Sequence, residues 1–154
     1  MGSDRMMHAQ RSIDIAAPAQ TVYAFAQDIG RWPQLLPHYR YVTVTREQPS
    51  SRIAVMAARR GWIPVRWTTE QRLDPVTPRI EFTHLSGWTA GMKVAWIFAP
   101  IAGGTRVSII HDLDFRRIPL VGSWIGERII GDFFIQSIAG KTLARMKELA
   151  EAAT

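Results

Sequence analysis

Residues 13–44 read IDIAAPAQTVYAFAQDIGRWPQLLPHYRYVTV, and the hydrophobic spacing changes several times along this stretch. Residues 8–15 partly alternate between apolar and polar side chains, which predicts a strand. In 19–29 the apolar residues recur at helical spacing, with a proline just before the run and a glycine just after it. Prolines limit 31–38 to a helical turn or loop, and 39–46 predicts a second strand.

Five further strands follow this opening, separated by short connections that contain glycine, proline or small residues. They are predicted at 52–60, 63–73, 79–85, 92–98 and 105–115. Such connections are too short for crossover helices, so consecutive strands should pair as an antiparallel meander. After Pro119 the apolar residues return to helical spacing, from Val121 to Leu149, which predicts one long C-terminal helix with an apolar first half.

Length and composition indicate one domain. The chain has 154 residues and is 47% hydrophobic, enough for a single core. We assign 7–154 to this domain and interpret 1–6 as a vector remnant or an upstream start. Cysteine is absent, which excludes disulfides, thiolate metal sites and a cysteine nucleophile. No stretch resembles a signal peptide or a membrane span, so the expected location is the cytoplasm.

The formal net charge is +6. Arginines are scattered along the chain, and the only doublets are at 59–60 and 116–117, so no basic stripe of the kind that binds nucleic acid is present. An excess of positive charge is compatible with an acidic carrier protein or an anionic membrane surface as a partner. No phosphate-binding glycine loop, nucleophile elbow or zinc-binding helix motif occurs, and we expect no cofactor.

The stretch 13–44, together with GGTRVSIIHDLDF at 103–115 and the tail 141–151, resembles the polyketide cyclase/dehydrase and lipid transport family of the START-like (SRPBCC) superfamily. The resemblance implies an α+β helix-grip fold. In that fold a curved antiparallel sheet of about seven strands wraps around a long C-terminal helix, with two short helices after the first strand. It also implies an internal cavity, and a function among polyketide aromatase/cyclases, quinone-binding proteins and lipid carriers.

Strand parity predicts which side chains line that cavity, because alternate residues share a face. In 63–73 the odd positions should point inward. If the hairpins are tight, one layer across the inner face holds Thr69, His84, Met92 and His111. The next layer holds Gln71, Phe82, Val94 and Ile109, while Trp67 and Leu113 lie on the other side.

His84 and His111 are the candidate catalytic residues, separated by one strand and hence about 10 Å apart. Imidazoles ordinarily titrate near neutral pH, so one could remove a proton from a methylene between two carbonyls while the other donates one. Aldol cyclisation and dehydration need that chemistry. A role as hydrogen-bonded core residues or simple ligand contacts is the alternative. No inward carboxylate joins the histidines, so a metal site is not expected.

Other side chains are candidates for contact with an apolar, aromatic or polycyclic ligand: Trp67, Thr69, Gln71, Phe82, Met92, Ile109, Leu113 and Trp88. Trp88 lies in a glycine-flanked loop that could be a lid or a staple onto the helix. The family resemblance suggests a pocket arginine that polarises carbonyls, and Arg66 matches it loosely. Parity points Arg66 outward unless a bulge beside Pro64 turns it.

The sequence leaves three functions open. The first is binding, and as a polyketide aromatase/cyclase also conversion, of an aromatic ligand. The second is noncatalytic transport of a lipid or quinone, with Arg116 and Arg117 docking on an anionic membrane. The third is an interaction module with a filled cavity.

Overall fold

The computed structural model describes residues 6–87, 89–114 and 137–154. Seven strands form one sheet: β1 (Met6–Ile15), β2 (Tyr39–Gln48), β3 (Ser51–Arg60), β4 (Ile63–Asp74), β5 (Arg79–Ser86), β6 (Lys93–Ile101) and β7 (Gly104–Asp114). Between β1 and β2 lie α1 (Ala19–Gln27), the 3-10 turn η2 (Ile29–Arg31) and α2 (Trp32–Leu35), and α4 (Gly140–Ala152) follows β7. The predicted strands and short helices are therefore confirmed, and β1 begins one residue inside the segment interpreted as a remnant.

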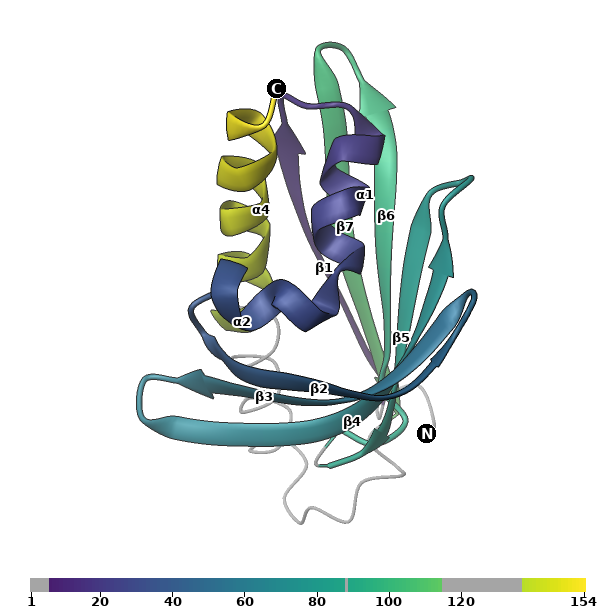
Figure 1. The fold of residues 1–154 in the computed structure, drawn as a ribbon, viewed down its shortest axis with the longest axis vertical. Helices are drawn as coiled ribbons and strands as arrows, with labels where there is room; N and C mark the ends of the chain where they lie inside the picture. The colour runs from purple at the N-terminus through teal and green to yellow at the C-terminus, as the bar shows by residue number, and fades with distance from the viewer. Residues whose placement is uncertain (1–5, 88, 115–136) are drawn as a thin grey trace.

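The sheet has the order β1-β7-β6-β5-β4-β3-β2, and every neighbouring pair is antiparallel. This is the predicted meander, with the first strand added beside the last. The sheet curves strongly, so that β2, β3 and β4 lie almost across the direction of β1 and β7 (Figure 1). A helix-grip fold is thereby confirmed.

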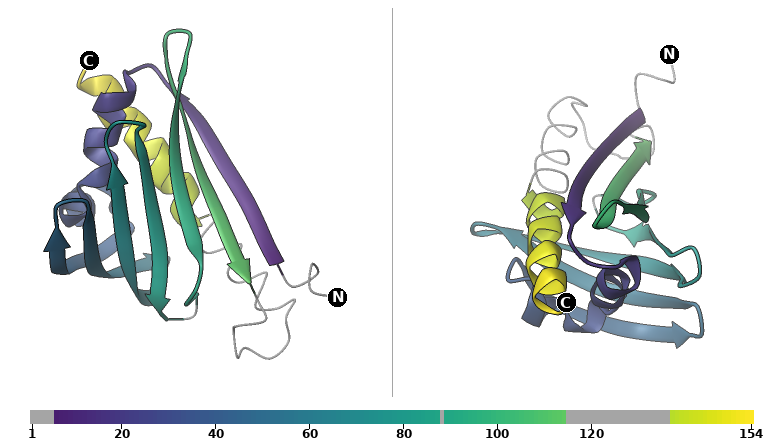
Figure 2. Two further views of the ribbon diagram at one scale, coloured as in Figure 1. Left: turned by 90° about the vertical axis from the view of Figure 1, so that its right-hand side faces the viewer. Right: turned by 90° about the horizontal axis from the view of Figure 1, so that it is seen from above.

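The helices cover the concave face of this sheet, and α1 and α4 lie next to each other against it (Figures 1 and 2). In α4 the buried residues recur at helical spacing, at Thr142, Leu143, Met146 and Ala150. A π-helical turn at 137–139 precedes this helix. The rest of the predicted C-terminal helix lies outside the described residues. None of the described helices has the length and apolarity needed to cross a membrane.

One part of the predicted register was wrong. His111 pairs with Val94 rather than with Met92. The reason is that β6 continues to Ile101, which pairs with Gly104 across a two-residue turn, whereas the sequence suggested a longer connection. Gly103 permits the tight turn with its positive φ of 79°. His111 therefore lies one layer further along the sheet than predicted.

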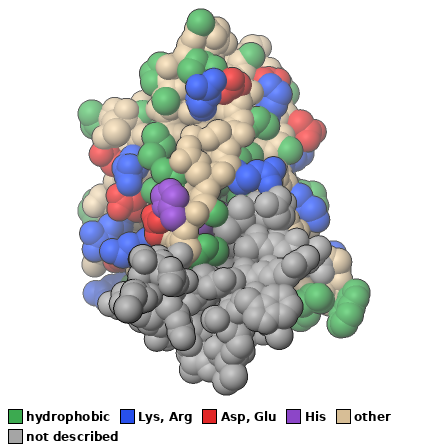
Figure 3. Space-filling view, turned by 180° about the vertical axis from the view of Figure 1, so that it is seen from behind, with side chains coloured by type: hydrophobic (Ala, Val, Ile, Leu, Met, Phe, Trp, Pro, Cys, Tyr) green, Lys and Arg blue, Asp and Glu red, His purple; other side chains and the backbone are tan. Residues whose placement is uncertain are grey.

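On the face shown in Figure 3, Lys and Arg side chains are interspersed with Asp and Glu. Several arginines form exposed pairs with carboxylates. Arg106, for example, contacts Asp14 across β7 and β1, and Arg79 contacts Glu81 on the same strand. Such exposed pairs contribute little to stability. Most of the positive charge on the described residues is thus dispersed over the outside of the sheet.

Candidate functional site

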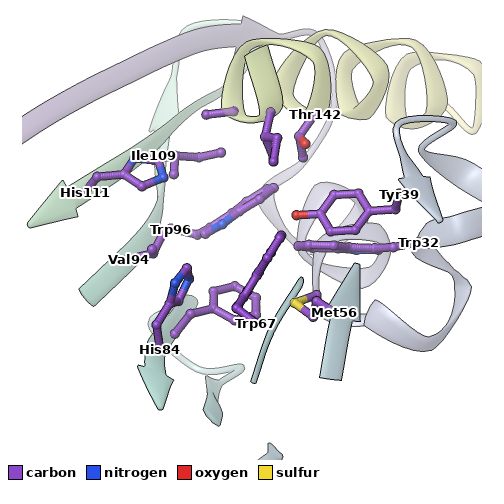
Figure 4. A pocket seen from close by; sticks show the side chains of 13 residues that line it. Trp32, Tyr39, Met56, Trp67, His84, Val94, Trp96, Ile109, His111 and Thr142 are labelled. Carbon is purple, nitrogen blue, oxygen red and sulfur yellow. The ribbon is translucent and has the colours of Figure 1, made fainter. Parts of the chain in front are cut away.

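An internal cavity lies between the concave face of the sheet and the helices α2 and α4 (Figure 4). Its lining is largely aromatic and aliphatic, with a few polar groups: Trp32, Tyr39, Met56, Trp67, Phe82, His84, Val94, Trp96, Ile109, His111, Ile138, Ala139 and Thr142. The void has a volume of ≈ 40 Å³. That is room for a few water molecules, while pockets for drug-sized ligands measure about 300–1,000 Å³.

Five of the predicted site residues line this cavity: His84, His111, Trp67, Phe82 and Ile109. Thr69, Gln71, Met92 and Leu113 are buried as predicted from parity, but they are not among its lining residues. Trp88 lies outside the described residues.

Arg66 is exposed on the outer face of β4. The pairing of β4 with β3 runs through Arg66 without a bulge, so nothing turns its side chain inward. The expectation that Arg66 is a carbonyl-polarising pocket residue was therefore wrong. Alternate residues of an unbulged strand share a face, and Arg66 lies on the face opposite to that of the cavity residue Trp67.

The side chains of Gln71 and Thr69 already have partners within the protein. Gln71 accepts a hydrogen bond from Arg52 Nη1 at 3.0 Å and donates to the carbonyl of Gln27 at 3.2 Å. The Thr69 hydroxyl donates to the carbonyl of Thr83 at 3.1 Å. These bonds join α1, β3, β4 and β5, so both residues have structural roles.

Contacts with Thr89 and Trp67 help to hold His84 in place. Its Nδ1 lies 2.6 Å from the hydroxyl of Thr89, and its ring stacks on the indole of Trp67 with centroids 5.5 Å apart. Burial lowers the pKa of His84 from 6.5 to about 3, and the nearby imidazole of His111 adds to that effect. His84 is therefore neutral at physiological pH.

His111 extends from β7 toward the cavity (Figure 4) and is 4% exposed. Its Nδ1 is buried and has no hydrogen-bond partner among the described residues. Burial lowers the pKa of His111 to about 4, although the charge of neighbouring Asp112 acts in the opposite direction. A buried nitrogen without a partner costs about 1–3 kcal/mol, and a ligand could recover that loss.

Trp32 provides a second atom of this kind. Its indole Nε1 is buried and without a partner among the described residues, and the side chain is 2% exposed. An indole N–H can only donate, so it suits a carbonyl or hydroxyl oxygen. The hydroxyl of Tyr39 also points into the cavity (Figure 4), and burial raises its pKa. Neither residue is among the candidate site residues predicted from the sequence.

The remaining lining residues come from β3 (Met56), β6 (Val94 and Trp96), the π-helical turn (Ile138 and Ala139) and the start of α4 (Thr142). Thr142 contacts the cavity and also shares a 2.9 Å hydrogen bond with Nε2 of His38. Burial, together with the charge of Lys141, lowers the pKa of His38 to about 4. Sequence analysis missed Met56 and Thr142 as lining residues. Strand parity could have suggested Met56, but only the folded arrangement brings Thr142 of α4 beside His38, just before β2.

The two neutral imidazoles change the chemistry expected from the sequence. Neither His84 nor His111 carries a second proton near pH 7, so neither acts as an imidazolium acid before a ligand binds. Each can donate one N–H to a carbonyl oxygen and accept through the other nitrogen. Among the described residues, no three His, Asp or Glu side chains are grouped to hold a metal ion.

Comparison with known proteins gives a consistent picture. The family model described as polyketide cyclase/dehydrase and lipid transport matches residues 15–136. The granaticin polyketide synthase bifunctional cyclase/dehydratase of Streptomyces violaceoruber is 29% identical over 115 residues, which make up 71% of this chain and 35% of that protein. The ribosome association toxin RatA of Pseudomonas aeruginosa is 29% identical over 120 residues, 77% of this chain and 82% of that protein.

The Zhui aromatase/cyclase from Streptomyces sp. R1128 has a structure with a TM-score of 0.84 to this chain. The match covers 95% of this chain and 94% of that one at 18% identity, so it demonstrates a shared fold. The chain spans only 35% of the length of the granaticin and actinorhodin cyclase/dehydratases that it matches.

Proposed function

The chain belongs to the polyketide cyclase/dehydrase and lipid transport family, and on that premise we propose that its cavity binds a planar, carbonyl-bearing polyketide or aromatic molecule and promotes ring closure by aldol condensation and loss of water. The observation that carries this proposal is the pair of unpartnered buried nitrogens, Nδ1 of His111 and Nε1 of Trp32, on residues of one aromatic-lined cavity.

The reaction would use these groups as hydrogen-bond donors. A methylene between two carbonyls loses a proton to a base, and the resulting enolate carbon forms a carbon–carbon bond with a third carbonyl, whose oxygen takes up a proton and becomes a hydroxyl group. The remaining hydrogen of the former methylene is then removed as a proton, and the hydroxyl leaves with a proton as water, which gives the carbon–carbon double bond. Donors fixed in a dry cavity stabilise the charge on an enolate oxygen more strongly than water does. Trp32 and His111 are the donors that we assign to this role.

The base is one of the two histidines in this proposal. A pKa of about 3 or 4 makes each imidazole a weak base in the empty cavity. An enolate next to an imidazole favours its protonated form and so raises its pKa while the reaction proceeds. The mutual influence of His84 and His111 means that only one of them takes up the proton.

The small void requires that a ligand move the walls of the cavity. Trp67 and Trp96 are buried lining side chains, and Ile138 and Ala139 in the π-helical turn form part of the wall at α4. π-Helical turns occur often at functional sites. Rotation of the two indole side chains and outward movement of the π-helical turn would make room for a ring system without breaking the sheet.

A synthetic triketone tests the proposal, if its 1,3-diketone methylene can close a six-membered ring onto the third ketone. We expect the protein to accelerate formation of the conjugated cyclic enone, followed by absorbance. His111→Phe and Trp32→Phe, which keep an aromatic ring, should each lower this acceleration at least about tenfold, because each removes a donor worth about 1.4 kcal/mol. Equal rates in the wild type and both variants would refute the cyclase proposal.

A second candidate is noncatalytic carriage of a quinone or lipid, which the weak basicity of both imidazoles favours. Quenching of the cavity tryptophans by alizarin, a planar quinone, measures binding directly. Competition by palmitic acid would indicate a lipid carrier. Alizarin binding with no effect on the triketone would favour carriage over cyclisation.

The two candidate functions imply different partners. A lipid or quinone carrier is expected to meet an anionic membrane, whereas a cyclase is expected to receive its substrate from an acidic carrier protein.

A further inference from the structure

The β3–β4 hairpin presents an unusual apolar tip. Trp62 is 89% exposed and the adjacent Ile63 is 42% exposed. Gly61 forms the tight connection with a positive φ of 60°. Figure 1 shows this hairpin extending past α2 and α4, and in Figure 3 hydrophobic side chains project from the corresponding end of the molecule. A fully exposed tryptophan beside an exposed isoleucine on a projecting turn indicates a contact surface.

Positive charge lies directly beside this tip. Arg59, Lys141 and Arg145 line a groove of ≈ 500 Å³ that also includes Gly61. Glu148 is the one carboxylate among the described residues that line the groove, and it contacts Arg145 at 3.4 Å. Within the described ranges, Arg59 and Lys141 form no ion pair with a carboxylate. Three cations facing one carboxylate make the groove attractive to an anionic group.

We infer that the hairpin tip and this groove together dock on an anionic lipid bilayer. Tryptophan favours the boundary between headgroups and acyl chains, and nearby Arg and Lys are attracted to anionic headgroups. The apolar pair lies at a convex, projecting end, which can insert between headgroups, and the groove behind it can hold a lipid phosphate. A protein interface would more typically enclose its aromatic anchor at the centre of the patch.

This surface adjoins the internal cavity. His38 lines the groove, Thr142 lines the cavity, and the 2.9 Å hydrogen bond between them lies in the partition. Docking would therefore bring the wall between His38 and Thr142 close to the membrane, where apolar molecules are concentrated. The inference goes beyond the cyclase proposal, because membrane docking does not depend on a reaction inside the cavity.

Flotation with vesicles tests this docking surface. The probes are phosphatidylcholine vesicles with and without phosphatidylserine, at low and high salt. We expect binding to the anionic vesicles, weakened by salt. Trp62→Ala should reduce partitioning at least about tenfold, since it removes a large apolar anchor. Arg59→Glu should reduce it by a similar factor, because it reverses a charge beside the membrane.

Two matched variants control for composition. Val76 is also 89% exposed but lies in the turn between β4 and β5, so Val76→Ala should leave partitioning within about twofold. Arg46 is exposed near the C-terminal end of β2, away from the β3–β4 tip. Arg46→Glu should therefore reduce partitioning less than Arg59→Glu does. Failure to float with anionic vesicles, equal effects of Trp62→Ala and Val76→Ala, or binding to polyglutamate in place of vesicles would overturn the inference. None of these outcomes bears on the triketone reaction.

Discussion

The indole of Trp67 and the imidazole of His84 lie nearly parallel, with ring centroids 5.5 Å apart and an angle of 18° between their planes. They come from adjacent strands, where Thr69 is the direct partner of His84 and Trp67 is its diagonal neighbour. A register shift follows between Thr69 and Thr68. Both rings line the cavity, and an aromatic face that the stack leaves free could receive a planar guest.

Replacing the indole of this stack should weaken binding of a planar ligand. We expect Trp67→Leu to raise the Kd of alizarin roughly tenfold, because it removes the aromatic face, whereas Trp67→Phe should recover most of the affinity. Quenching of the remaining tryptophans measures both values. If Trp67→Phe bound no better than Trp67→Leu, shape rather than stacking would determine binding.

The buried histidines should make the protein sensitive to acid. The pKa values of His38, His84 and His111 are lowered from 6.5 to about 4, 3 and 4. Below pH 6.5 the unfolded chain binds protons that the folded chain does not, so stability that is present above pH 6.5 is lost as the pH falls toward 4. Each histidine contributes a slope of up to about 1.4 kcal/mol per pH unit.

Urea unfolding at a series of pH values measures this loss. His38→Gln, in which the amide can still bond Thr142, should remove about one third of the slope. A free energy of unfolding that stays constant between pH 6.5 and pH 4.5 would contradict the buried neutral state of these side chains.

Gln71 should matter for stability and not for binding. Gln71→Leu keeps the approximate volume but leaves Arg52 Nη1 without one acceptor and the carbonyl of Gln27 without one donor. We expect a loss of about 1–3 kcal/mol in the free energy of unfolding. The alizarin Kd should remain within about twofold. A large increase in Kd with unchanged stability would restore Gln71 as a ligand contact.

Gly104 is expected to be intolerant of any side chain. A Cβ at this position would clash with the carbonyl oxygen of Ile15, so β1 or β7 would have to shift. Gly104→Ala should cost about 3 kcal/mol or more, and thermal melting should show a Tm lower by roughly 10 °C. Gly30→Ala is the control, since a methyl group there would have no atom within 4 Å and the φ of Gly30 is not positive. Similar melting temperatures for the two variants would contradict this close approach.

The fold was largely predictable from sequence because its signals are local. Alternation within each strand and helical spacing after Pro18 depend only on neighbouring residues, and short connections permit only antiparallel pairing. Parity also identified the buried positions Trp67, Phe82, His84 and His111. Cross-strand register was less predictable: the two-residue turn at the end of β6 moved His111 from the layer of Met92 to that of Val94.

The composition of the site depends on contacts between distant parts of the chain. Trp32 and Thr142 line the cavity only because α2 and α4 pack on the same concave face. The strand pattern could not indicate that Gln71 would meet Arg52 and Gln27, or that burial would keep both imidazoles neutral. The burial of a side chain depends on all the elements that surround it, so the lowered pKa values of the imidazoles could be derived only from the fold and not from the strand pattern.

The most direct test of the central claim is the indole N–H signal of Trp32 in a proton–nitrogen NMR spectrum, assigned with Trp32→Phe and recorded during titration with alizarin. The account predicts that this signal moves downfield and saturates together with tryptophan quenching, because the unpartnered N–H gains a carbonyl acceptor. Saturable quenching with the Trp32 N–H unmoved would contradict it, because the ligand would then bind without the donor that the cavity provides.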